Sequence, residues 1–244
     1  MNAAQQLPLP LPSRAALGRE DFFVSPANAL AVSQIDTWRD WSAHKLILVG
    51  PGGAGKTHLA HVWQQQSGGS IIAARDLLGA EIPMLAAGHV CVEDVEEISG
   101  NRPAEETLFH LHNLVLANGG TLMITARREP VHWRLTLPDL ASRMMAIPVA
   151  RIEDPDDALL SALLAKLFAD RQIMPTPEVI GYLVSRMPRS YETAARLVSA
   201  LDAEALAHRR SVSRPLAARV LAQVVPPGTE SRRPGDPEPE AGQP

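Results

Sequence analysis

The sequence predicts an α/β domain, with helices on both faces of a parallel sheet, followed by a small all-α domain. Short apolar runs alternate with helical patterns between residues 21 and 151, the order of elements that a parallel sheet requires. From residue 152 to residue 225 the pattern is helical throughout. Alanine and leucine carry most of the apolar content and aromatic residues make up only 4% of the chain, which also favours helix.

Each element can be assigned from its own pattern. The expected strands are residues 45–50, 70–74, 89–94, 121–126 and 145–150. The expected helices of the α/β domain include residues 56–66 and 104–118. The expected helices of the second domain are residues 154–172, 176–187, 190–210 and 213–225. Asp154-Pro155 and Thr176-Pro177 are expected to start the first two of these, each as an N-cap residue followed by proline at the first helical position.

The two ends of the chain differ in composition from the rest. Residues 1–20 are rich in proline and leucine, and residues 226–244 contain no apolar side chain larger than alanine or proline. Such a tail buries too little apolar surface to offset the entropy lost on ordering. We therefore expect a flexible N-terminal tail and a disordered C-terminal tail.

Charge and cysteine content exclude several classes of protein. A net charge of −4 provides no global basic field for holding DNA or an anionic membrane. The single cysteine, Cys91, forms no disulfide framework and is expected to be a small buried apolar residue. No signal-peptide pattern and no apolar run of membrane-spanning length is present. We expect a soluble cytoplasmic protein without strong DNA binding of its own.

Residues 50–57, GPGGAGKT, fit the phosphate-binding pattern G-x-x-x-x-G-K-[ST] between an expected strand and an expected helix. Glycines let backbone N–H groups close around a phosphate, and the helix N-terminus adds partial positive charge. Lys56 is expected to reach the β- and γ-phosphates, and the Thr57 hydroxyl to bind Mg²⁺. The alternative, a glycine-rich turn with a chance lysine, does not explain the flanking strand and helix. The expected nucleotide-binding residues of this segment are Pro51, Gly52, Gly53, Ala54, Gly55, Lys56, Thr57 and His58.

A P-loop site also needs an acid at the end of a neighbouring strand. Glu93 and Asp94 end the expected strand 89–94, so one carboxylate would hold the Mg²⁺ shell and the other would orient a water. An ordinary acidic loop is the alternative, since Glu96 and Glu97 follow directly.

With these features in order, residues 22–225 resemble the DnaA/Hda family of AAA+ ATPases, which act in bacterial replication. The segment FFVSPANALAVSQIDTW resembles the family's segment around the adenine, which implies that Phe23, Val24 and Asn28 line a base pocket. The segment GGTLMITARREP resembles the sensor 1 strand, which implies that Thr125 and Arg127 lie near the γ-phosphate. The implied cofactors are ATP or ADP and Mg²⁺. The implied fold is an AAA+ domain with a helical lid.

The segment LPDLASR resembles the part of the family that carries an arginine finger, which implies that Arg143 acts in trans on a neighbour's nucleotide. Without the resemblance, a surface arginine would be the better interpretation. The family's sensor 2 arginine falls at or near Glu192, and Arg189 and Arg196 lie about one turn away on either side. Either one substitutes for it, or the function is lost. We therefore expect nucleotide binding with at most weak hydrolysis by the chain itself.

At the N-terminus, Gln6, Leu7, Leu9, Pro10 and Leu11 resemble the family's peptide for the DNA polymerase III sliding clamp, the beta subunit. Glutamine offers both a donor and an acceptor. Leucines two apart on an extended chain face the same side, and prolines reduce the entropy lost on docking. A solvated leucine–proline tail is the alternative.

The family's initiator carries a DNA-binding domain after the lid, and we expect this chain to lack it, since the expected lid is followed by the proline-rich tail 226–244. The resemblance therefore points to the shorter, regulatory members and implies the DnaA initiator and the sliding clamp as partners, at the replication fork on the nucleoid. We expect a negative regulator of replication initiation that promotes ATP hydrolysis on DnaA. An autonomous ATPase of the clamp-loader or helicase-loader type and a non-catalytic clamp adaptor stay open, as does homo-oligomerisation.

Overall fold

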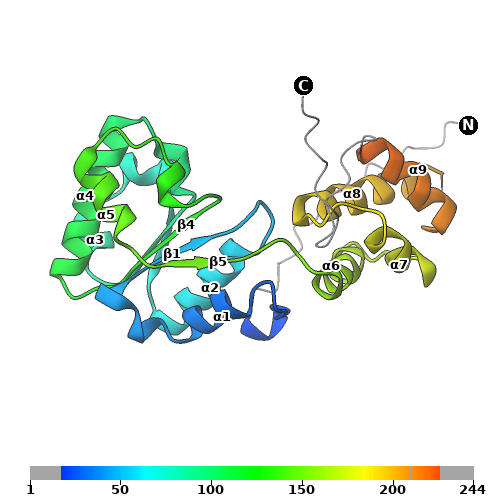
Figure 1. Cartoon of the computed structure of the whole chain (residues 1–244), viewed down its shortest axis with the longest axis horizontal. Helices are drawn as coiled ribbons and strands as arrows, with labels where there is room; N and C mark the ends of the chain where they lie inside the picture. Colours follow the sequence, from blue (N-terminus) through cyan, green and yellow to red (C-terminus); the bar gives the residue numbers. More distant parts are fainter. Residues whose placement is uncertain (1–17, 209, 226–244) are drawn as a thin grey trace, which may run out of the picture.

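The computed structural model describes residues 18–208 and 210–225. Its first part is built on one sheet of five parallel strands in the order β2-β3-β4-β1-β5 (Figure 1). The strands are β1 (Lys45–Val49), β2 (Ser70–Ala73), β3 (Val90–Glu93), β4 (Leu122–Ala126) and β5 (Val149–Arg151). Because β4 lies between β3 and β1, the segments that follow these three strands meet at one edge of the sheet.

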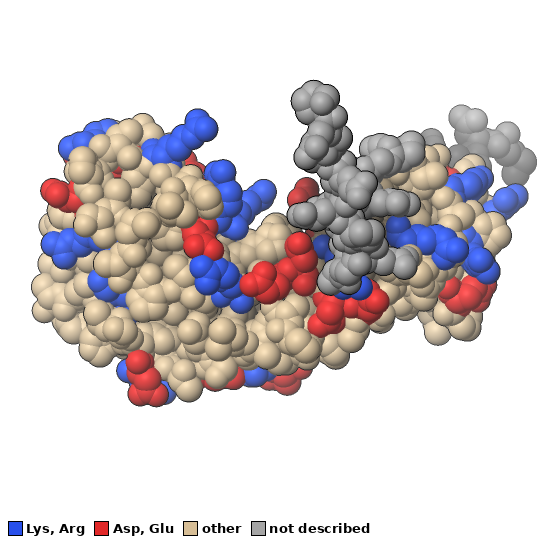
Figure 2. All heavy atoms as spheres, viewed as in Figure 1, with Lys and Arg blue, Asp and Glu red and all other residues tan. Residues whose placement is uncertain are grey.

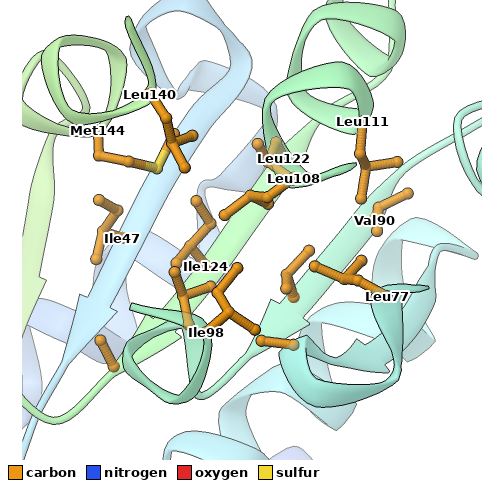
Figure 3. Close-up of a cluster of buried hydrophobic side chains, with 14 of the residues drawn as sticks. Ile47, Leu77, Val90, Ile98, Leu108, Leu111, Leu122, Ile124, Leu140 and Met144 are labelled. Atoms are coloured by element: carbon orange, nitrogen blue, oxygen red, sulfur yellow. The ribbon is translucent and has the colours of Figure 1, made fainter. Parts of the chain in front are cut away.

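Helices cover both faces of this sheet. They are α1 (Ala29–Asp36), α2 (Lys56–Ser67), α3 (Ile82–Leu85), α4 (Arg102–Ala117) and α5 (Pro138–Met145). Successive residues of β1 alternate between the faces: Leu46 and Leu48 pack with α1 and α2, while Ile47 and Val49 pack with α3, α4 and α5. Figure 3 shows Ile47 in this second cluster, together with Leu108 of α4 and Leu140 of α5. On the α2 face, Cys91 is fully buried, as expected, and burial raises the pKa of its thiol.

After β5 the chain forms helices with an apolar core of their own, on the right in Figure 1. These helices are α6 (Asp157–Asp170), α7 (Glu178–Val184), α8 (Tyr191–His208) and α9 (Arg214–Val224). Leu164 and Phe168 of α6 share this core with Leu197 and Leu201 of α8. The predicted fold class, a parallel α/β domain followed by helices, is confirmed. Within the described ranges, no helix is both long and apolar enough to cross a membrane.

The strand expected at residues 145–150 is shorter in the structure. Helix α5 extends to Met145, and β5 begins only at Val149. The reason is packing: Met144 is fully buried against the sheet, which keeps this segment helical. Local sequence pattern does not separate a short buried strand from the buried end of a helix.

Two helix starts also differ from the prediction. Asp156, rather than Asp154, is the N-cap of α6, and its Oδ1 accepts a hydrogen bond from the Leu159 N–H at 2.7 Å. Pro177 is the N-cap of α7 rather than its first helical residue. At α6, Asp156 and not Asp154 lies close enough to accept from the Leu159 N–H, which has no partner within the helix.

Glu105 joins α4 to the segment that leads into α5. Its carboxylate is fully buried and accepts hydrogen bonds from the N–H groups of Gly100, Thr136 and Leu137 and from the Thr136 hydroxyl, at 2.7 to 3.0 Å. Burial by itself raises the pKa of this carboxyl, but the hydrogen bonds outweigh burial and lower the pKa below its ordinary value. The start of α5, the helix that carries Arg143, is therefore fixed to α4 by a buried charge.

Replacing Glu105 with glutamine is expected to lower the free energy of unfolding by about 2 kcal/mol at neutral pH, because an amide cannot accept all of these donors. Since the folded-state pKa is depressed, the stabilisation is complete above the unfolded-state pKa and is lost as the pH falls through the folded-state pKa. The difference between wild type and variant should therefore shrink below about pH 4.5. Chemical denaturation at neutral and acid pH measures both effects, with the exposed Glu106→Gln as control. A difference that stays constant with pH would contradict this account.

Candidate functional site

The glycine-rich loop connects β1 to α2 at the carboxyl edge of the sheet. Gly53 and Gly55 adopt left-handed backbone conformations, with φ of 77° and 90°, which side chains with a Cβ rarely tolerate. At Gly55 space is also short, because an added Cβ would lie 2.7 Å from the Phe22 ring. The loop therefore turns tightly enough to aim its N–H groups and the start of α2 at a bound anion.

Lys56, the first residue of α2, lies beneath this loop. Its side chain is 8% exposed, and Nζ donates hydrogen bonds to the carbonyls of Gly50 at 2.7 Å and Pro51 at 3.0 Å. Burial lowers the pKa of the ammonium, and the nearby Asp94 carboxylate opposes that change. The ammonium is thus already desolvated and held at the loop where a phosphate would bind.

Acidic side chains follow β3, next to the loop. Asp94 is in a left-handed conformation with φ of 54°, and its N–H donates to Oγ1 of the buried Thr125 on β4 at 3.1 Å. Backbone strain of this kind is kept where a side chain must be aimed. Glu93 Oε1 is buried and has no hydrogen-bond partner among the described residues. That orphaned oxygen, together with Asp94 and the exposed Thr57 hydroxyl, supplies the oxygen ligands that Mg²⁺ prefers.

Glu96 fixes the segment after β4, and motif reasoning gave this residue no role. Its carboxylate accepts hydrogen bonds from the N–H groups of Arg127 at 3.1 Å and Arg128 at 3.0 Å, and from Arg128 Nε at 3.2 Å. The exposed Arg127 side chain extends to the glycine-rich loop, since a Cβ added at Gly52 would lie 3.8 Å from its Cζ. Arg127 therefore reaches the phosphate loop from β4.

The start of α8 closes the other side of the loop. Tyr191 is buried against Gly53, and its hydroxyl donates to the Glu153 carbonyl at 3.2 Å. Glu192 Oε2 would lie 3.5 Å from a Cβ at Gly52, on the side where Arg127 also lies. Figure 2 shows basic and acidic side chains gathered where the α/β part meets the helical part. Local sequence pattern offers no signal for Tyr191, because its role depends on this contact between distant segments.

The two arginines expected near the sensor 2 position make their contacts within the helical part. Arg189 Nη2 forms an ion pair with Asp157 Oδ1 of α6 at 3.0 Å. Arg196 Nη2 donates to the Val224 carbonyl at the end of α9, at 3.4 Å. Of these positions on and before α8, it is Glu192 that faces the phosphate loop.

The segment before α1 lies beside the start of α2. Asn28 is buried and holds this segment in place: its Oδ1 accepts from the Ser25 N–H at 2.9 Å and its Nδ2 donates to the Phe23 carbonyl at 3.0 Å. The Phe23 and Val24 side chains are 50% and 42% exposed. Phe22, which the sequence did not single out, packs edge-on against His58 with ring centroids 5.2 Å apart.

Arg143 lies apart from these residues, near the end of α5. Its guanidinium is exposed and lies over the Phe109 ring of α4, 5.7 Å from the centroid. It forms no ion pair with any residue in the part of the chain that the structure describes. In Figure 1, α5 lies on the opposite side of the α/β part from α6–α9. The clamp-binding residues expected at positions 6–11 lie outside the described residues.

No protein-family model matches the chain. Among solved structures, the fold matches AAA+ domains. The chain is similar to domain III of the replication initiation protein DnaA from Thermotoga maritima, at a TM-score of 0.74 and 19% identity over 89% of this chain and 100% of that domain. It is also similar to AMPPCP-bound DnaA from Aquifex aeolicus, at a TM-score of 0.60 and 20% identity over 78% of this chain and 67% of that one. The FIGL-1 AAA domain in complex with ADP matches at a TM-score of 0.59 and 16% identity, over 82% of this chain and 79% of that one. At these identities the matches establish the fold.

Proposed function

We propose that this chain is a nucleotide-binding regulator of replication initiation, of the kind that Hda represents in the DnaA/Hda family, and that it acts on ATP held by the DnaA initiator. The observation that carries the proposal is the pairing of two sites on one DnaA-like fold. One is a complete phosphate loop with a buried Lys56. The other is an exposed Arg143 without an ion-pair partner among the described residues, on the last turn of α5, at the end of the sheet opposite to that loop.

Adenine nucleotide is the proposed ligand of the phosphate loop. The loop glycines, Lys56 and the start of α2 would hold the phosphates. Arg127 would lie beside them, and the segment at Phe23 and Val24 would offer apolar surface to the base. Similar folds have been solved with AMPPCP and with ADP. Thr57, Glu93 and Asp94 would hold Mg²⁺, which supplies positive charge to the phosphate oxygens when bound.

The chain is proposed to hydrolyse its own nucleotide weakly. Glu192, at or near the position of the family's sensor 2 arginine, places a negative charge beside Gly52 of the loop. A like charge beside an anion disfavours both its binding and the charge that develops during transfer. Slow hydrolysis would leave the nucleotide bound to this chain, where it would serve to keep the chain in its active conformation.

Hydrolysis is proposed to occur on the partner instead. An arginine finger offers a planar fork of donors to the charge that develops on a γ-phosphoryl group. Arg143 is held for this task by its contact with Phe109 and by the Glu105 network at the start of α5. The QLPLPL segment would tether the chain to the DNA-loaded sliding clamp. Tethering raises the effective concentration near the initiator without new contacts between the two proteins.

Conversion of DnaA-bound ATP to ADP tests this proposal, measured with and without DNA-loaded clamp. We expect stimulation by the wild type that depends on the clamp and that falls about tenfold or more in Gln6→Ala, because tethering is lost. The neighbouring Gln5→Ala is the matched control and should behave as the wild type. Absence of stimulation by the wild type would refute the proposed function, whereas rapid turnover of free ATP by this chain alone would favour an autonomous ATPase.

A further inference from the structure

Lys45 and Arg143 lie at the amino edge of the sheet, away from the phosphate loop. Lys45 is the first residue of β1, and the loop follows the last residue of the same strand, which places them about 17 Å apart along an extended strand. Helix α5 ends at Met145, shortly before β5 begins. Its C-terminal turn, with Arg143, therefore lies at the edge where the parallel strands start.

These two cations have no acidic partner in the residues that the structure describes. Neither Lys45 nor Arg143 forms an ion pair there. Burial lowers the pKa of the Lys45 ammonium, and the positive charge of Arg143 lowers it further. Asp139, one turn before Arg143 on α5, does not pair with it. Ile47, two residues after Lys45 on β1, pairs with Val149 of β5, and β5 follows shortly after the end of α5 that carries Arg143. The topology thus brings the two cations to the same end of the sheet, where both charges would stabilise an added anion.

A third basic group of this part of the molecule lies on α4. His112 on α4 is fully buried, its Nδ1 is paired with Asn113 Oδ1 at 3.1 Å, and its Nε2 has no partner within the described ranges. Burial is the main cause of the lowered pKa of this imidazole, and the charges of Lys45 and Arg143 add to it. His112 therefore does not supply the negative charge that the two cations lack.

The backbone before Lys45 is also unusual. Ala43 and His44 both have positive φ, at 51° and 56°. Two consecutive non-glycine residues in this conformation are held against their intrinsic preference, which proteins retain mainly where geometry has a function. The strained turn fixes the direction from which Lys45 enters β1.

We propose that Lys45 is a second cation of the surface that carries Arg143, and that the two bind the same terminal phosphate of a polyphosphate, namely the γ-phosphate of ATP held by a partner chain. This inference rests on the proposed function, since that function places a partner's ATP against Arg143. Arg143 would supply the planar fork of donors, and Lys45 a point charge from the neighbouring strand.

Substitution of Lys45 tests its contribution to the partner reaction. Lys45→Gln removes a positive charge beside the phosphate and should lower the stimulated conversion of DnaA-bound ATP about tenfold. The loss should not be larger, because the Lys45 charge is partly screened by solvent. Lys45→Arg should restore most of the rate. The chain has three lysines, Lys45, Lys56 and Lys166, so Lys166→Gln on α6 is the matched control. A Lys45→Gln variant as active as the wild type would overturn the inference.

A second measurement does not depend on the partner. The three lysines are acetylated at limiting reagent with the phosphate loop saturated with ADP, and modification of each is followed by peptide mass spectrometry, with and without inorganic triphosphate. Triphosphate should protect Lys45 severalfold and leave Lys166 unchanged, and Arg143→Gln should remove the protection. Equal protection of Lys45 and Lys166 would refute the anion site. Protection of Lys45 without any stimulation of DnaA would refute only the proposed function.

Discussion

Replacing Arg143 with alanine is expected to reduce the stimulated hydrolysis of DnaA-bound ATP by about 10³-fold, the lower end of what an arginine finger contributes. The guanidinium is exposed, lies over Phe109 and makes no ion pair with the residues described, so its removal leaves no buried partner unsatisfied. The free energy of unfolding should therefore change little. Single-turnover conversion of radiolabelled ATP on DnaA, beside a thermal melt of the variant, measures both quantities.

Two further variants show whether the effect is specific. Arg143→Lys keeps the charge but loses the planar fork, and should recover only a small part of the rate. Arg219→Ala removes an exposed arginine of α9 and should leave the rate unchanged. An Arg143→Ala protein that stimulates hydrolysis fully would exclude the arginine-finger role and would leave the clamp-adaptor alternative.

Replacing Lys56 with alanine is expected to weaken ADP binding about 100-fold, because a desolvated ammonium makes strong charge-assisted hydrogen bonds to phosphate. In the structure Lys56 Nζ donates hydrogen bonds to the loop carbonyls of Gly50 and Pro51, at 2.7 Å and 3.0 Å. Isothermal titration with ADP and Mg²⁺ measures the affinity. A second readout is thermal: ADP at about 100 times its Kd should stabilise the wild type by about 2.7 kcal/mol and the variant far less.

Lys166→Ala is the control for the loss of a lysine, because its partner is the exposed Asp170 on the surface of α6. Unchanged ADP affinity in Lys56→Ala would show that the loop holds the phosphates through backbone groups alone. Loss of ADP binding without loss of clamp-dependent stimulation would show that nucleotide occupancy of this chain is not required for its action on DnaA.

Sequence reasoning recovered the elements whose pattern is local. Leu46, Ile47, Leu48 and Val49 form a continuous apolar run, and both faces of β1 are buried as such a run predicts. The phosphate loop was predictable for the same reason, since glycine at Gly55 is dictated by its own backbone conformation. The starts of β5 at Val149 and of α6 at Asp157 were predicted a few residues too early. Several neighbouring residues could begin each element, and packing in the first case and capping in the second decide among them.

The sequence by itself determined the class of this protein: a parallel sheet, a phosphate loop at the end of a buried strand, and a helical domain behind it. These features follow from residue types at fixed spacing. The tertiary structure alone decided which side chains meet. It placed Glu192 rather than Arg189 at the loop, gave Glu96 and Tyr191 their contacts, and brought Lys45 and Arg143 to the same end of the sheet. Contacts between segments far apart in the chain depend on strand order and helix packing, which no local pattern encodes.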